Sequence, residues 1–209
     1  NGVHGRELWR ADGTGASMVK DIYPGAGMSL PSNLTNVNGT LFFNANNGVN
    51  GYELWRSDGT EAGTSMVVNG LPDPGVPQPD QEGFGPTSLT NVNGTLYYRY
   101  PVIIDGMYRP ALWKSDGGVP SLVKITEANG NLAWLTNFNG KLFYAELTAA
   151  YGLEPWIYDG ASAPAMIKDI SPGPTGSNPS QPYNVNGALF FMANGDELWK
   201  SDGTPAGTV

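Results

Sequence analysis

The chain has 209 residues, a formal net charge of −8 and no cysteine. An acidic surface repels phosphate backbones, so we expect no nucleic-acid partner. The lack of cysteine excludes disulfides and thiolate metal sites. No apolar run approaches the roughly 20 residues of a transmembrane helix, so we expect no membrane insertion. Hydrophobic residues make up 40% of the chain, enough to bury a core, and we treat residues 1–209 as a single domain.

Both ends of the chain lie within a repeated pattern. Residues 1–5 match residues 47–51, which precede the second copy of a motif. The last residues, Gly207–Val209, match Gly63–Ser65, which lead into an apolar segment. We therefore expect an incomplete arc of a longer repeat protein. Its neighbours would come from further sequence or from another chain.

Each repeat begins with a predicted β-hairpin. In the clearest copy, strands at 34–37 and 40–43 flank Asn38-Gly39. Asn-Gly is a strong hairpin signal because both turn residues need a positive φ. The same turn recurs at Asn93-Gly94, Asn139-Gly140 and Asn186-Gly187. We predict four such hairpins, each with its asparagine at positive φ.

The third predicted strand carries the motif Glu-Leu-Trp-Arg-Ser-Asp-Gly-Thr at 53–60. Complete or degenerate copies occupy 7–14, 111–118, 154–161 and 197–204. Their tryptophans are spaced by 46, 58, 43 and 43 residues, and they are Trp9, Trp55, Trp113, Trp156 and Trp199. Such a period, carried by strand-like segments, is typical of a propeller or a similar array. We expect all five indoles to be buried between neighbouring sheets.

An Asp-Gly turn follows the third strand in every copy and leads to a fourth strand, such as 17–22 or 165–170. The turn aspartates are Asp12, Asp58, Asp116, Asp159 and Asp202. Turn geometry is a sufficient reason for their recurrence, because aspartate bonds to backbone two residues further on.

The second and third strands carry adjacent apolar residues, such as Leu41-Phe42-Phe43 and Leu54-Trp55. Side chains alternate across a strand, so both faces of each sheet must be covered. The predicted fold is therefore all-β, a β-propeller of four-stranded antiparallel blades. The strand count favours five or more blades.

Two insertions, at 70–86 and 99–110, interrupt the period and flank the degenerate third motif, where Ala111 replaces glutamate. Loops on a rigid scaffold often carry function. The candidate ligand-binding residues here are Arg99, Tyr100, Asp105, Tyr108 and Arg109. The alternative is drift within one repeat of a tolerant array.

The motif, together with the flanking Val-Asn-Gly-Thr-Leu-Phe-Phe and Val-Lys-Asp-Ile segments, resembles the bacterial ELWxxDGT repeat family. This resemblance covers nearly the whole chain and implies a secreted or surface-exposed protein, mostly without an assigned activity. The third and fourth copies depart from it at Ala111, Gly118, Pro155 and Ile157. The turn at 57–60 also resembles the Asp-box of sialidase-type propellers, a hairpin element with no catalytic role.

Four glutamates share one repeat position: Glu7, Glu53, Glu154 and Glu197. One interpretation is a ring of oxygen ligands for a hard cation such as Ca²⁺. The other, which we favour, is that each glutamate accepts hydrogen bonds from the backbone of a neighbouring blade. We expect no cofactor, with Ca²⁺ as the one alternative kept open.

These observations favour a non-enzymatic extracellular protein that serves as a binding, adhesion or structural module with a protein or glycan partner. We assign no catalytic residue: the only histidine, His4, lies near the start. Two of the five arginines, Arg10 and Arg56, belong to the repeated motif, which leaves too few for a carboxylate-binding cluster. One alternative is a carbohydrate-binding propeller lectin. Another is part of a secreted sialidase-like hydrolase whose catalytic residues lie elsewhere.

Overall fold

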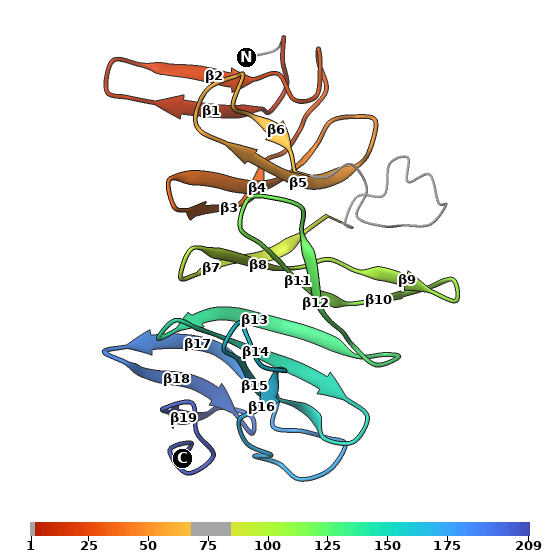
Figure 1. Cartoon of the computed structure of the whole chain (residues 1–209), viewed down its shortest axis with the longest axis vertical. Coiled ribbons are helices and arrows are strands. Elements are labelled where there is room, and N and C mark those ends of the chain that lie inside the picture. Colours follow the sequence, from red (N-terminus) through yellow and green to blue (C-terminus); the bar gives the residue numbers. More distant parts are fainter. Residues whose placement is uncertain (1–2, 68–84) are drawn as a thin grey trace.

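The structure, a computed structural model, describes residues 3–67 and 85–209 (Figure 1). These residues form strands, turns and loops without any helix, and hence no helix that spans a membrane. The expected all-β class is confirmed. The strands form five successive antiparallel sheets, which we number 1 to 5 in chain order, and one separate hairpin.

Sheets 2, 3 and 4 each have four strands. Sheet 2 contains β3 (Ser32–Val37), β4 (Thr40–Asn46), β5 (Tyr52–Ser57) and β6 (Ser65–Met66). Sheet 3 contains β7 (Thr87–Val92), β8 (Thr95–Arg99), β11 (Ala111–Ser115) and β12 (Ser121–Ile125). Sheet 4 contains β13 (Asn131–Phe138), β14 (Lys141–Thr148), β15 (Gly152–Tyr158) and β16 (Ala165–Met166). In all three sheets the strands pair in the order first, second, third, fourth.

The outer two sheets have fewer strands. Sheet 1 pairs β1 (Leu8–Ala11) with β2 (Ala16–Lys20), the third and fourth strands of a repeat. Sheet 5 contains β17 (Ser180–Val185), β18 (Ala188–Ala193) and β19 (Glu197–Ser201), which are the first three. The fourth strands are shorter than expected, since β16 ends at Met166 rather than Ile170.

The hairpin turns follow the prediction. Asn38, Asn93, Asn139 and Asn186 have φ of 51°, 51°, 50° and 51°, and a glycine at positive φ follows each. This conformation suits the twist of an antiparallel pair, which explains why Asn-Gly stands there.

The two insertions differ in what the structure describes. Most of the first, 70–86, lies outside the described residues. The second, 99–110, contains the separate hairpin of β9 (Val102–Ile104) and β10 (Met107–Arg109). Figure 1 shows this hairpin projecting sideways from the stack of sheets.

The core lies between the sheets, and each strand contributes to two interfaces. Leu54 packs with Tyr98 and Trp113 of sheet 3, whereas its neighbour Trp55 packs with Leu8 and Val19 of sheet 1. In this motif the leucine faces the following sheet and the tryptophan faces the preceding one. Side-chain alternation along a strand produces this division.

The expectation that all five motif tryptophans are buried is wrong for Trp9. Trp55 and Trp113 are 6% and 5% exposed, whereas Trp9 is 44% exposed. Trp156 and Trp199 are half-buried. Trp9 faces away from sheet 2, and no described residues form a sheet on that side.

The sheets follow one another along the molecule, with the two chain termini at opposite ends (Figure 1). The described residues close into no ring. The closest backbone approaches between sheets run along the first strands, β3, β7, β13 and β17. Thr35 Oγ1 donates to the Leu89 carbonyl at 3.1 Å, and Thr90 Oγ1 donates to the Leu135 carbonyl at the same distance.

Candidate functional site

The four motif glutamates do not form a common ligand cluster. Glu7, Glu53 and Glu154 are buried, Glu7 just before β1 and the other two near the starts of β5 and β15, whereas Glu197 is exposed. Among residues 3–67 and 85–209, no group of three or more histidine, cysteine, aspartate or glutamate side chains is positioned to hold a metal ion.

Two of these glutamates hold the connection to the next sheet. Glu154 accepts hydrogen bonds from the backbone N–H groups of Ile170, Ser171 and Ser177 at 3.2, 3.0 and 2.9 Å. The Ser177 hydroxyl donates to the same carboxylate at 2.6 Å. Glu7 is bound in the same way by Ile22 and Ser29. Their partners lie in the loop before the next first strand, not in the strands of the neighbouring sheet.

The basic residue after the tryptophan links consecutive sheets. Arg10 Nη1 donates to the Gly59 carbonyl at 3.1 Å, and Arg56 Nη1 donates to the Gly117 carbonyl at 2.8 Å. Lys114 Nζ donates to the Gly160 carbonyl at 3.3 Å. Each acceptor is the glycine of the next Asp-Gly turn. The repeated basic residues are therefore structural contacts between sheets.

The turn aspartates act within their own turns. Asp58 Oδ1 accepts hydrogen bonds from the Thr60 hydroxyl at 2.7 Å and the Thr60 N–H at 2.8 Å. These bonds stabilise the carboxylate and lower the pKa of Asp58 below its usual value. Asp12 and Asp202 have the same threonine-bonded arrangement, and their pKa values are lowered for the same reason. Asp159 accepts bonds from Ala161 and Ser162, which also lower its pKa.

The five candidate ligand residues of the second insertion separate into two places. Asp105 and Tyr108 lie on the exposed β9–β10 hairpin, with Asp105 in its turn at a φ of 54°. Tyr108 is 44% exposed, and the neighbouring Met107 is 57% exposed. Arg109, at the end of β10, is only partly exposed.

The other two candidates belong to sheet 3. Arg99 ends β8, and its Nη2 donates to Asn131 Oδ1 of sheet 4 at 3.3 Å. Burial lowers the pKa of the Arg99 guanidinium. The Tyr100 carbonyl accepts a hydrogen bond from the Trp113 indole at 3.0 Å. Both residues therefore help to pack sheet 3, which leaves the hairpin itself as the exposed part of this region.

A groove of about 350 Å³ runs across the first strands of four sheets. It contains one equivalent position from each of them: Asn33, Ser88, Trp134 and Gln181. All four residues have a φ between 51° and 61°, beside an irregularity in strand pairing. A bulge of this kind re-aims a side chain.

Trp134 and Tyr183 supply the aromatic surface of this groove. Trp134 is 45% exposed and Tyr183 is 67% exposed. The sequence indicated Trp134 only indirectly. It is the one tryptophan outside the motif, at a position where the other repeats have asparagine, serine or glutamine. A positive φ is uncommon for a bulky residue, and such residues are concentrated at functional sites.

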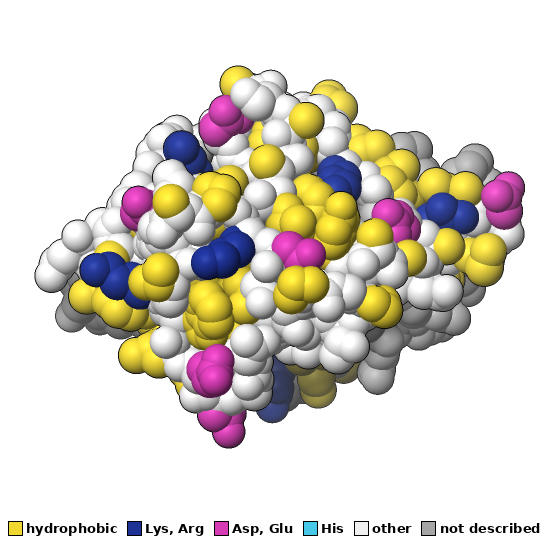
Figure 2. All heavy atoms as spheres, turned by 90° about the horizontal axis from the view of Figure 1, so that it is seen from below, with side chains coloured by type: hydrophobic (Ala, Val, Ile, Leu, Met, Phe, Trp, Pro, Cys, Tyr) yellow, Lys and Arg dark blue, Asp and Glu magenta, His cyan; other side chains and the backbone are white. Residues whose placement is uncertain are grey.

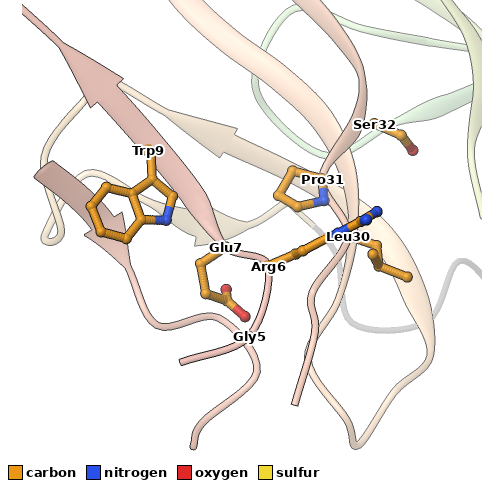
Figure 3. Close-up of a pocket in the computed structure, with 7 residues that line it drawn as sticks. All are labelled: Gly5, Arg6, Glu7, Trp9, Leu30, Pro31 and Ser32. Carbon is orange, nitrogen blue, oxygen red and sulfur yellow. The ribbon is translucent and has the colours of Figure 1, made fainter. Parts of the chain in front are cut away.

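A second hollow, of about 570 Å³, lies beside the exposed Trp9 (Figure 3). Trp9 stands on one side of it, with Leu30 and Pro31 on the other. The free edge of β1 lies here, because the described residues pair β1 with β2 alone. In sheet 2 the corresponding edge of β5 is occupied by β4.

Comparison with protein-family models and with curated proteins finds no match for this chain.

Proposed function

We propose that the chain is an arc of a β-propeller with five or more blades, and that it acts as a non-enzymatic extracellular binding, adhesion or structural module. The close approach of the first strands supports the propeller arrangement, since neighbouring blades converge towards their inner strands. The extracellular location follows from the resemblance of the repeats alone.

One observation carries the functional proposal: the basic residues of the repeats are hydrogen-bonded to turns of the next sheet. Arg10, Arg56 and Lys114 all make this contact. These contacts between sheets explain why a basic residue recurs at this position of the motif. No catalytic role is needed to explain it. Residues that differ between repeats are the better candidates for binding, and exposed examples lie in the groove and on the β9–β10 hairpin.

The groove favours a second, more specific function, which is carbohydrate binding. Exposed aromatic faces such as those of Trp134 and Tyr183 present flat apolar surfaces with a polar rim. The pyranose ring has one comparatively apolar face that can stack on such a surface. The neighbouring Asn33, Ser88 and Gln181 supply groups that hydrogen-bond sugar hydroxyls.

A glycan array tests both functions. We expect binding of oligosaccharides by the unaltered chain, and loss of that binding in Trp134→Ala and Tyr183→Ala. Tyr151→Ala, an exposed aromatic in the turn between β14 and β15 and outside both surfaces, is the matched control and should bind normally. Loss of binding only in a third variant, Tyr108→Ala, would place the site on the hairpin.

Mass spectrometry of the same glycans after incubation separates binding from catalysis. Bound glycans recovered without cleavage support a binding module. Accumulation of a hydrolysed product would contradict the non-enzymatic proposal and favour the sialidase-like alternative. If no glycan binds, carbohydrate binding is rejected, and the hairpin becomes the surface to test with protein partners.

A further inference from the structure

The groove across the first strands has an uncharged lining. Of the residues that the structure describes, ten line it, and none of these is an aspartate, glutamate, lysine, arginine or histidine. The surface elsewhere is different, since Figure 2 shows charged side chains of both signs scattered over one end of the molecule. The lack of charge therefore distinguishes the groove from the surface at that end.

The recurring polar side chains of the first strands are already bonded inside the protein. Thr35 and Thr90 donate to main-chain carbonyls of the next sheet. Asn91 Nδ2 donates to the Asn36 carbonyl at 2.8 Å, and Asn137 Nδ2 donates to the Asn91 carbonyl at 2.9 Å. These polar groups are therefore occupied by contacts between sheets.

The polar side chains at the bulges are not bonded in this way. Among the described residues, no hydrogen bond engages the side chains of Asn33, Ser88 or Gln181. Asn33 and Gln181 are exposed, and Ser88 is half-buried. An amide or a hydroxyl can both donate and accept a hydrogen bond. The groove therefore presents available donors and acceptors without a net charge.

Trp134 supplies a flat apolar surface among these polar groups. It lies on β13 of sheet 4, whose neighbours are β7 of sheet 3 and β17 of sheet 5. Its 45% exposure therefore does not depend on either end of the chain. The bulge residues Ser88 and Gln181 belong to those two neighbouring strands. A flat apolar surface between donors and acceptors is complementary to a sugar ring, which has an apolar face and a rim of hydroxyls.

We infer that the groove binds an uncharged oligosaccharide, laid across the first strands with one ring stacked on Trp134. This inference rests on the carbohydrate binding proposed above and names the class of glycan. Asn33, Ser88 and Gln181 bond to hydroxyls of successive sugar units. A sialic acid or a uronate would bring a carboxylate into a site that has no cation to pair with it, which is unfavourable. The net charge of −8 adds a general repulsion of anions.

A proline-rich peptide is the competing ligand, because such peptides also stack in grooves lined by aromatic residues. Proline has no N–H, so these peptides offer mainly carbonyl acceptors. The amide oxygens of Asn33 and Gln181 would then lose water without gaining a donor. Sugar hydroxyls both donate and accept, so they satisfy both ends of each amide.

A glycan array that carries neutral oligosaccharides beside their sialylated and uronate-containing forms tests the inference. We expect the unaltered chain to bind neutral members, and to bind the charged form of each about tenfold more weakly or worse. Equal or stronger binding of the charged forms would overturn the inference and leave carbohydrate binding intact. If no glycan binds, both fail. Binding of a polyproline peptide on the same array, lost in Trp134→Ala, would overturn it in favour of a peptide ligand.

A cation placed in the groove should change this preference. Gln181→Lys gives a carboxylate a partner, so the binding of charged forms relative to neutral ones should rise by about tenfold. Val119→Lys adds the same charge outside the groove, at a position that is 86% exposed, and should keep the preference for neutral glycans. An equal change in both variants would show an effect of overall charge and contradict a site in the groove.

Calorimetry with two lengths of one neutral glycan tests whether the ligand lies across the sheets. Asn33 is on sheet 2, whereas Trp134 is on sheet 4. Asn33→Gly removes the amide and tolerates the φ of 55°. It should weaken binding of a tetrasaccharide by about two- to tenfold and leave binding of the disaccharide unchanged. Equal losses for both lengths, or no loss for either, would overturn the proposed path of the ligand.

Discussion

At the scale of single residues, adjacent side chains in one motif serve different interfaces. Leu54 packs towards sheet 3 and Trp55 towards sheet 1, although they are neighbours in the chain. The same motif therefore stabilises two contacts at once. The stabilisation that one copy of the motif provides therefore depends on whether a sheet lies on each side of its strand.

The loss of unfolding free energy on replacing a motif tryptophan should depend on which sheet carries that tryptophan. Trp55→Ala removes a buried indole and should lower the free energy of unfolding by about 3–5 kcal/mol. Trp9→Ala should cost much less, because Trp9 is 44% exposed and Trp55 only 6%. Urea unfolding followed by circular dichroism measures both. Equal losses would contradict the burial difference between the two positions.

Because of the turn aspartates, the free energy of unfolding should depend on pH in the acid range. Hydrogen bonds from Thr60 lower the pKa of Asp58 in the folded chain relative to the unfolded chain. The resulting stabilisation is complete above the unfolded value of about 3.9, and it is lost as the pH falls through the lower folded value.

Carboxyl NMR titration of Asp58 should show this lowered pKa directly. Asp58→Asn keeps an acceptor oxygen in the turn but does not titrate. It should therefore reduce the loss of stability between neutral pH and about pH 2. An unchanged acid profile in Asp58→Asn would show that other carboxylates govern acid unfolding.

At the scale of elements, the Asn-Gly hairpins form a chain of contacts from sheet to sheet. Asn38 Nδ2 donates to the Gly94 carbonyl at 3.3 Å, and Asn93 Nδ2 donates to the Gly140 carbonyl at 3.1 Å. Asn139 continues the series to Gly187 at 2.8 Å. The turn residue thus has a local role in its hairpin and a second role between sheets.

Two substitutions at Asn93 separate these roles. Asn93→Ala loses the hydrogen bond and places alanine at positive φ, so we expect a loss of about 1–2 kcal/mol in unfolding free energy. Asn93→Gly loses the hydrogen bond but tolerates the φ of 51°, so its loss should be smaller. Thermal unfolding of both variants provides the comparison. A glycine variant as unstable as the alanine variant would mean that the turn conformation contributes little.

At the scale of the whole molecule, each sheet contacts its neighbours in a linear series. Stability in such an array is close to a sum of terms for each sheet and each interface. Sheets 2, 3 and 4 have a neighbour on both sides, whereas sheet 1 has two strands and one neighbour. Stability should therefore vary along the molecule.

Native-state hydrogen exchange should reveal this variation. We expect the amides of β1 and β2 to exchange fastest and those of β14, in the middle of sheet 4, to be the most protected. Mass spectrometry of peptides from each sheet provides the measurement. Uniform protection across all five sheets would indicate one cooperative unit instead.

Local chemistry made the strands and turns predictable. The Asn-Gly pairs identified four hairpins because few other residues adopt their backbone angles. The exposure of Trp9 was not predictable in the same way, since it depends on which sheets lie beside β1. Nor did the sequence indicate that Trp134 lies at a bulge, because Ser88 and Gln181 share that conformation without sharing its chemistry. The targets of Glu154 lie up to 23 residues away, beyond the reach of local patterns.

The acceptors between sheets are main-chain carbonyls, as at Gly59, Gly117 and Gly160. A main-chain carbonyl remains available as an acceptor when the side chains of its repeat are substituted. A duplicated or transplanted repeat would therefore join its new neighbour through the same bond, provided that it kept the turn. Lineages carrying such a gene can lengthen or shorten the array by recombination between repeats, and protein engineers can do the same with cassettes of one sheet each.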